Sequence, residues 1–378
     1  MHKLHNNPVT PACKQRIASL DVMRGFSMFW LIGGAAFIQA IATHFPSDIT
    51  TGLAEQMTHA RWRGIKFYDL IFPLFIFTSG ATIPLTVWRG EESGKSRRKL
   101  ALTALKRAAI LIFIGVIYNE WLNHDFSNPR FCSVLGQIGA SYLIGFFIYL
   151  VNPSSKKLLA AFTGILLIIG MLQLLPPEAS LSKNINPSNN INSWIDLTLT
   201  PGRLLEKNYD PEGLLNWISA ASICLLGAWT SKQVNKPREG KKGQIDQSLL
   251  IPAVAGVILI ATGLAMDGFY PIIKRIWTAS YTTTAGGICI LLFLSIHIVA
   301  DRKKRTKPFF IFTVIGANSL IAYTSQQLFN YPQFTRSAGN HLAAIVNSKS
   351  SLPGVLLTML STLCLLYWLH KKRIYLKV

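Results

Sequence analysis

Long apolar runs alternate with short polar segments along the whole chain. Ten runs are long enough for a helix to cross the ~30 Å hydrocarbon core of a bilayer, which takes about 20 residues. They lie near residues 22–42, 66–88, 101–118, 132–151, 158–175, 213–231, 248–266, 277–300, 309–329 and 351–370. The pattern therefore predicts an all-α polytopic membrane protein, a bundle of about ten transmembrane helices that forms a single integral-membrane domain over residues 1–378.

The polar segments fall into two alternating sets that differ in charge. One set holds 24 Lys and Arg and comprises residues 1–16, 89–99, 152–157, 230–247, 301–307 and 371–378. The other holds ten and comprises residues 43–65, 119–131, 176–212, 267–276 and 330–350. Because basic loops stay in the cytoplasm, we expect both termini to be cytoplasmic. An even number of spans agrees with this, since it puts both termini on the same side of the membrane.

Composition supports this class. The chain has 378 residues, of which 50% are hydrophobic and 15% charged, against roughly 25% charged residues in soluble domains. The net charge of +21 follows from the cytoplasmic loops, and no basic stripe lies on a polar domain, so we expect a lipid bilayer and no nucleic acid as partner. Five dispersed cysteines without a Cys-x-x-Cys pair predict no metal.

The densest run of reactive side chains extends from Thr58 to Pro73, where the first outer loop enters the second span. His59 can act as a base or a nucleophile near neutral pH. Asp69 lies a few residues into a span, where an unpaired carboxylate is costly, and it could orient the imidazole. A loop histidine is often only solvated, so this run alone leaves both interpretations open.

Other polar groups at the membrane edge also allow two interpretations. Asp21 and Arg24 share a helix face at the predicted cytoplasmic entrance to span 1, either as a local ion pair or as a contact to an anionic ligand. Asp210 and Glu212 flank Pro211 on the outer side, where they fit either a helix start or a polar pocket.

Two more groups lie just before the eighth span and within the ninth. Lys274 and Arg275 are basic residues on the outer face, where they would bind lipid headgroups or a phosphate or acidic substrate. Asn318 belongs to a polar stripe in span 9, which fits either hydrogen bonding between helices or a polar cavity.

Taken in chain order, these residues resemble the transmembrane N-acetyltransferases typified by heparan-alpha-glucosaminide N-acetyltransferase, and most closely the bacterial members. The similarity covers spans 1 to 9. It rests on Asp21-x-x-Arg24-Gly25, His59-Ala-Arg-Trp62…Asp69-Leu-Ile-Phe-Pro73, Tyr209-Asp-Pro-Glu-Gly-Leu, Lys274-x-x-Trp277-x-x-Ser280-Tyr281 and Pro308-Phe…Gly316-x-Asn318-x-Leu320-x-x-Tyr323.

The resemblance implies transfer of an acetyl group from cytoplasmic acetyl-CoA to the amine of a glucosamine-type amino sugar across the membrane. It implies a bacterial inner-membrane enzyme whose acceptor site faces the periplasm, and it allows a homodimer. His59 and Asp69 would be catalytic. The expected substrate-binding residues are Trp62, Tyr209, Asp210, Glu212, Lys274, Ser280 and Asn318, and we expect Asp21, Arg24 and Arg107 at the cytoplasmic mouth, where CoA would bind.

The sequence departs from the family pattern at three places. Ala35 and Ile273 stand where many relatives have Asn, and Gly136-Gln-Ile-Gly replaces Gln-Arg-Ile-Gly. These departures leave the acceptor sugar open. Two other functions remain as alternatives, namely a secondary transporter of sugars or amino-sugar derivatives and a membrane O-acyltransferase, although the latter class lacks the Tyr-Asp-Pro-Glu-Gly run.

Overall fold

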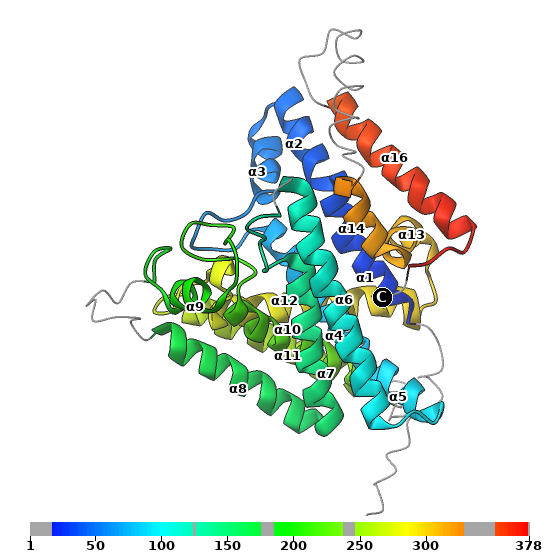
Figure 1. Ribbon diagram of the computed structural model, residues 1–378. Helices are drawn as coiled ribbons and strands as arrows, with labels where there is room; N and C mark the ends of the chain where they lie inside the picture. Colours follow the sequence, from blue (N-terminus) through cyan, green and yellow to red (C-terminus); the bar gives the residue numbers. More distant parts are fainter. Residues whose placement is uncertain (1–16, 124–125, 175–184, 237–245, 329–351, 377–378) are drawn as a thin grey trace, which may run out of the picture.

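The computed structural model describes residues 17–123, 126–174, 185–236, 246–328 and 352–376, and most of these residues are helical. Figure 1 shows the helices packed into one bundle. Their bounds are α1 Ala18–Phe29, α2 Ala35–His44, α3 Asp48–Gln56, α4 Ile71–Ala81, α5 Ile83–Glu92, α6 Arg97–Asn123, α7 Val134–Val151, α8 Ser155–Leu174, α9 Ile191–Leu199, α10 Leu214–Val234, α11 Gln247–Met266, α12 Ala279–His297, α13 Phe310–Ala317, α14 Ser319–Leu328 and α16 Leu352–Lys371.

The predicted fold class is confirmed. Within the described ranges, nine helical stretches are long and apolar enough to cross a membrane, and a bent pair of helices makes a tenth. Each coincides with a predicted apolar run to within a few residues, although residues 175, 329 and 351, at the ends of the fifth, ninth and tenth runs, lie outside the described ranges. The chain is an all-α polytopic membrane protein.

Two of the predicted spans are interrupted. A π-helical turn, Trp30–Gly34, joins α1 to α2, and Gly33 has a φ of 150°, which only glycine adopts readily. The ninth span is bent by 63° between α13 and α14, because the chain leaves the helical conformation at Asn318. Two short helices that hydropathy alone did not predict, α3 and α9, lie in the loops, and each begins at a side-chain cap.

Helix α10 forms the centre of the bundle. It packs against α4, α7, α8 and α12, and most of its residues are buried. Gly80 of α4 lies against the carbonyl of Cys224, and Gly227 of α10 lies against the carbonyl of Phe77, so that a Cβ atom at either glycine would collide with the backbone. Small residues allow this close approach, which is how helices associate in membranes.

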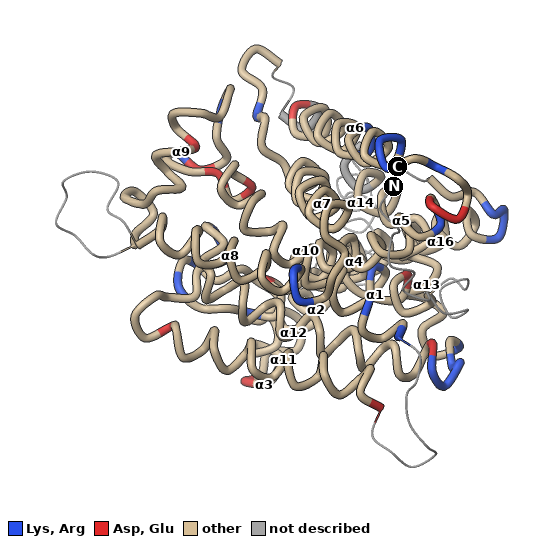
Figure 2. The backbone as a smooth tube through the Cα atoms, turned by 90° about the horizontal axis from the view of Figure 1, so that it is seen from below, with Lys and Arg blue, Asp and Glu red and all other residues tan. Residues whose placement is uncertain are grey.

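The peripheral helices expose apolar side chains that a bilayer would cover. On α8 these include Leu167, Ile168 and Met171, and on α11 they include Val257 and Ile258. Contiguous apolar surface of this kind is rare on soluble monomers. Charged residues are concentrated in short segments near helix ends, while the long helical stretches carry few of them (Figure 2).

The parts of the two sets of polar segments that the structure describes lie at opposite ends of the bundle. At the end that includes α3 and α9, the Trp62 indole N–H donates to the Ile185 carbonyl (3.0 Å). At the other end, the Ala18 amide donates to Asp301 (2.8 Å) and Arg302 to the Val234 carbonyl (3.3 Å). The contacts thus join segments that the charge pattern assigned to the same side. Which end is cytoplasmic stays a prediction, and residues 1–16 and 330–350 lie outside the described ranges.

Candidate active site

His59 and Asp69 form a hydrogen-bonded pair at one end of the bundle. The His59 Nδ1 lies 2.7 Å from the Asp69 Oδ1. The Asp69 side chain is fully buried, whereas 45% of the His59 side chain is exposed. In the neutral imidazole, Nδ1–H donates to the carboxylate, so the other ring nitrogen, Nε2, carries no proton and can act as a base or nucleophile.

The backbone around Asp69 fixes this carboxylate. Asp69 opens the second span in a short 3₁₀ turn, Phe67–Leu70. Its Oδ2 accepts the backbone N–H groups of Lys66 (3.0 Å) and Ala60 (3.2 Å), and the hydroxyl of Tyr281 donates to the Asp69 carbonyl (2.7 Å). Both carboxylate oxygens are therefore engaged, so Asp69 orients the imidazole and is not itself available to a ligand.

Lys274 reaches the same histidine from a distant part of the sequence. It begins a 3₁₀ turn, Lys274–Ile276, after which Trp277 takes a left-handed conformation (φ 47°) that reverses the chain into α12. The Gly64 amide donates to the Ile272 carbonyl (2.8 Å) and joins this segment to the His59 loop. The Lys274 Nζ lies 3.4 Å from the His59 Nδ1. The shorter contact to Asp69 decides that Nδ1 donates to the carboxylate.

Burial lowers the pKa of Lys274, and the nearby carboxylates of Asp69 and Glu212 oppose this effect. Burial thus disfavours the charged ammonium of this lysine, whereas the two carboxylates favour it.

A second cluster joins Arg130 to two carboxylates. Its guanidinium donates to Asp210 through both Nε (2.8 Å) and Nη2 (2.6 Å), and Nη2 also donates to Glu212. Asp210 accepts two further backbone N–H groups, those of Leu205 and Glu212 (3.0 Å each). Because these four hydrogen bonds occupy the acceptor positions of the Asp210 carboxylate, Asp210 has a structural role and is not free to bind a ligand.

Glu212 differs from Asp210 because it lines a cavity. Burial raises the pKa of Glu212, while the Arg130 guanidinium lowers it. Arg130 was missed as a functional residue in the sequence, where it counted only toward loop charge. The available signal was its position as the one Lys or Arg of segment 119–131, directly before an apolar run.

A cavity of about 1200 Å³ runs along the bundle and has His59, Lys274 and Glu212 at one end. Its wall follows α4 and α5 from Ile71 to Arg89, a length of about 25 Å at 1.5 Å per residue. The cavity therefore extends over most of the ~30 Å thickness of a hydrocarbon core. Its volume exceeds the ~300–1,000 Å³ of typical ligand pockets, which leaves room for an extended ligand.

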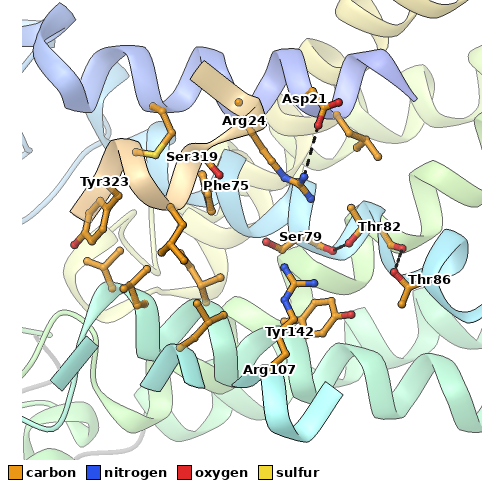
Figure 3. A pocket seen from close by; sticks show the side chains of 18 of the residues that line it. Asp21, Arg24, Phe75, Ser79, Thr82, Thr86, Arg107, Tyr142, Ser319 and Tyr323 are labelled. Atoms are coloured by element: carbon orange, nitrogen blue, oxygen red, sulfur yellow. Dashed lines mark hydrogen bonds and ion pairs between the residues drawn. The ribbon is translucent and has the colours of Figure 1, made fainter. Parts of the chain in front are cut away.

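The opposite end of this cavity is basic. Its lining there includes cationic side chains from α1, α5, α6 and the α5–α6 loop, namely Arg24, Arg89, Lys95, Lys106 and Arg107. Figure 3 shows Arg24 and Arg107 reaching into the pocket from opposite walls, near Ser79. The Arg107 guanidinium lies 4.5 Å from the centre of the Tyr142 ring, and its buried Nε has no hydrogen-bond partner among the described residues. Asp21 lines the cavity as well, 3.9 Å from Arg24.

A smaller cavity of about 260 Å³ adjoins His59 on another side. Its wall includes Trp30, Ala35, Gln39 and Tyr68. The indole Nε1 of Trp30 is buried and has no hydrogen-bond partner within the described ranges. His59 lines both cavities, so a group bound in either one would reach the same imidazole.

Several expected substrate-binding residues lie outside the walls of both cavities. The Trp62 ring packs edge-on against Tyr209, whose hydroxyl accepts from Arg275 (3.2 Å). The Ser280 hydroxyl donates to the Pro271 carbonyl (2.9 Å). Asn318, at the α13–α14 break, donates to the Ile374 carbonyl (3.0 Å) and accepts the Leu376 amide (3.2 Å), so it holds the C-terminal segment.

The three departures from the family pattern occupy different environments. Ala35 lines the smaller cavity beside His59. Gly136 lies against the Ser133 hydroxyl near the start of α7, and Ile273 is fully buried next to Lys274. Of the three, Ala35 bears most directly on what the smaller cavity can hold. In the part of the chain that the structure describes, no group of three or more His, Cys, Asp or Glu could hold a metal ion.

The fold and site define a polytopic membrane protein in which a histidine, oriented by a buried aspartate, lines two cavities. A family model described as a domain of unknown function (DUF5009) matches residues 16–197. Heparan-alpha-glucosaminide N-acetyltransferase of Homo sapiens is 24% identical over 429 aligned positions, covering 97% of this chain and 60% of the human protein. The same-named protein of Mus musculus is 24% identical over 382 positions, covering 85% of this chain and 56% of the mouse protein.

These matches make the chain a distant relative of heparan-alpha-glucosaminide N-acetyltransferase. The chain spans less than two thirds of the length of either curated relative.

Proposed function

We propose that this protein is a transmembrane acetyltransferase that moves an acetyl group from acetyl-CoA to the amine of an amino sugar on the other side of the membrane. The observation that carries the proposal is the position of His59. The His59 imidazole is oriented by Asp69 and lines both the long cavity, whose far end is basic, and the smaller cavity. The names of the two distant relatives support the same reaction class.

The long cavity suits the donor. CoA carries phosphate groups at one end and the acetyl thioester at the other, and guanidinium groups recognise phosphate through several parallel hydrogen bonds. Arg24 and Arg107 would bind the nucleotide phosphates, with Asp21 holding Arg24 in place. The pantetheine arm would follow the apolar wall of α4 toward His59. This places the donor on the basic side, which the charge pattern predicts to be cytoplasmic.

The smaller cavity suits the acceptor. It is much smaller than the donor cavity, and its size fits a single sugar ring better than a polymer. The Trp30 indole presents an apolar ring and a buried N–H that could donate a hydrogen bond to a sugar oxygen. Gln39 and Thr58 add polar groups to the cavity wall. In this orientation the acceptor faces the periplasm of a bacterial inner membrane.

His59 would take part in the transfer by one of two routes. In direct transfer, Nε2 removes a proton from the sugar ammonium, and the amine attacks the thioester carbonyl. The C–N bond forms, the C–S bond breaks, and the second proton lost by the nitrogen passes to the departing CoA thiolate. In the two-step route, Nε2 itself attacks the thioester carbonyl, and the C–S bond breaks to release the CoA thiolate. The amine then attacks the acetyl-imidazole, the C–N bond to the sugar forms, and the bond between Nε2 and the acetyl carbon breaks. The protons that the nitrogen loses pass to the freed imidazole and to water. In both routes Lys274 would stabilise the negative charge that develops on the carbonyl oxygen.

The two alternative functions, transport and O-acylation, predict different experimental outcomes. A transporter would use the long cavity, but it gives the hydrogen-bonded His59–Asp69 pair no role. An O-acyltransferase would make an ester instead of an amide.

The test is acetyl transfer from labelled acetyl-CoA to a panel of amino sugars by purified protein in nanodiscs. The wild type is compared with His59→Ala and with His44→Ala, since His44 is an exposed histidine at the end of α2. We expect amide product from the wild type and His44→Ala, and a loss of at least ~100-fold in His59→Ala. Sugar accumulation in proteoliposomes without acetyl-CoA and without product would replace the proposal with transport, and an ester product would replace it with O-acylation.

A further inference from the structure

Three buried side-chain amides form a continuous hydrogen-bonded chain beneath the active-site loops. They come from three helices: Gln173 from α8, Asn192 from α9 and Asn216 from α10. The Gln173 Nε2 donates to the Asn192 Oδ1 (2.8 Å), and the Asn192 Nδ2 donates to the Asn216 Oδ1 (2.9 Å). The exposed fractions are 3%, 1% and 0%, so no water competes for these bonds.

Other hydrogen bonds from these amides go to backbone carbonyls of the turn that carries Lys274. The Gln173 Nε2 also donates to the Ile276 carbonyl (2.7 Å), and the Asn216 Nδ2 donates to the Arg275 carbonyl (3.1 Å). These are the last carbonyls of a three-residue 3₁₀ turn, which lack partners within the turn itself. The amide chain satisfies both of them.

The same chain also holds the segment that carries Glu212. The Asn216 Nδ2 donates to the Pro211 carbonyl (2.9 Å) as well. One asparagine therefore ties together two loops that are distant in the sequence and that supply Lys274 and Glu212 to the same end of the cavity. A fully satisfied buried network is rigid, and a single broken member leaves unpaired polar groups in a dry site.

We propose that Gln173, Asn192 and Asn216 are positioning residues that hold the Lys274 turn in register with His59. This inference rests on the proposed function for its catalytic consequence, and on the hydrogen bonds alone for its structural one. A 3₁₀ turn of three residues has too few internal bonds to fix a lysine by itself. Displacement of a catalytic group by about 1 Å can reduce a rate by about 100-fold. The amide chain prevents such a displacement.

The test compares two substitutions within one helix. Asn192→Ala breaks the amide chain. Asn190→Ala removes the N-cap of the same helix, whose Oδ1 accepts the Ser193 amide (2.9 Å), without touching the Lys274 turn. Gln173→Met is a third variant of similar volume that lacks the donors, and it keeps the test valid if Asn192→Ala does not fold.

Two quantities are measured. The first is the labelling rate of the Lys274 amine by an acetylating reagent at about pH 8, determined by mass spectrometry relative to exposed Lys157. The second is kcat and KM for acetyl-CoA. We expect Asn192→Ala and Gln173→Met to change the Lys274 labelling rate at least about threefold and to lower kcat about 10–100-fold with KM within about threefold, and Asn190→Ala to do neither.

Unchanged Lys274 labelling in both amide variants would overturn the inference, and so would equal changes in Asn190→Ala, which would trace the effect to helix stability. If the wild type transfers no acetyl group, the proposed function fails, and the labelling rates still decide the inference.

Discussion

Replacing Asp69 with asparagine should nearly abolish transfer while leaving the fold intact. Both backbone N–H groups that bind this side chain donate to Oδ2, so the amide oxygen of the substituted side chain would keep them. Its NH₂ group would then face the His59 Nδ1 in place of Oδ1. Since an NH₂ group can only donate, Nδ1 would have to accept, and the ring proton would move to Nε2. The imidazole would then present a donor where the reaction needs a base.

The magnitude has two parts. A hydrogen bond to a charged group contributes about 1.5–3 kcal/mol, which corresponds to about 10–150-fold in rate. The wrong tautomer adds to this, and the equivalent carboxylate-to-amide change in a serine-protease triad lowers kcat about 10⁴-fold. We therefore expect kcat for Asp69→Asn to fall about 10²–10⁴-fold, with KM for acetyl-CoA within a few-fold.

The assay is steady-state transfer in nanodiscs, with melting temperature as a check on folding. The matched control is Asp48→Asn, the same substitution at an exposed carboxylate on α3, which should retain wild-type activity. If Asp69→Asn kept activity close to that of the wild type while His59→Ala lost it, the carboxylate would not set the tautomer, and this reasoning would be refuted.

Three further predictions follow from the charged groups. Arg107→Met should raise the KM for acetyl-CoA about 10–100-fold, because a charged phosphate contact is lost. Arg98→Met, at an exposed position on the same helix outside the cavity wall, should leave the KM unchanged. Equal KM values for the two variants would argue against donor binding at Arg107. Arg130→Gln leaves Asp210 and Glu212 buried without their cation and should cost about 3–5 kcal/mol of stability, measured by thermal unfolding in detergent. Arg97→Gln, which breaks an exposed pair, should cost only about 0–1 kcal/mol. A wild-type melting temperature for Arg130→Gln would contradict this prediction. Burial raises the pKa of Asp196 from 3.8 to about 6, so the folded protein binds the carboxyl proton more tightly than the unfolded chain does. The resulting stability, up to about 3 kcal/mol, is fully present below about pH 4. It is lost as the pH rises from about 4 through about 6. Asp196→Asn should flatten the pH dependence of unfolding over this range, and an unchanged profile would count against the assignment.

The membrane spans could be predicted from the sequence because each is a run of about 20 apolar residues, and that signal is local. The bends could not. The break at Asn318 depends on its hydrogen bonds to the C-terminal segment, which is distant in the sequence. The short helices α3 and α9 carried cap signals at Ser47 and Asn190, but hydropathy does not register such short helices in a loop.

The site shows the same division. His59 and Asp69 are close in the sequence, and their reactive side chains and membrane position marked them there. Arg130 and Asp210 are far apart in the sequence, and nothing local indicates that they meet. Trp62, Tyr209, Ser280 and Asn318 matched the family pattern, yet their side chains bind other parts of the protein outside the cavity walls. A shared motif therefore marks residues that build a site as well as residues that line it.

The most direct test of the central claim is the sidedness of transfer. Protein is reconstituted in sealed proteoliposomes of known orientation, with labelled acetyl-CoA on one side only and the amino sugar on the other. The account predicts acetylated sugar only when acetyl-CoA faces the end with Arg24 and Arg107 and the sugar faces the His59 end, with no product from His59→Ala. Product formed only when donor and acceptor share one side would contradict transfer across the membrane through these two cavities.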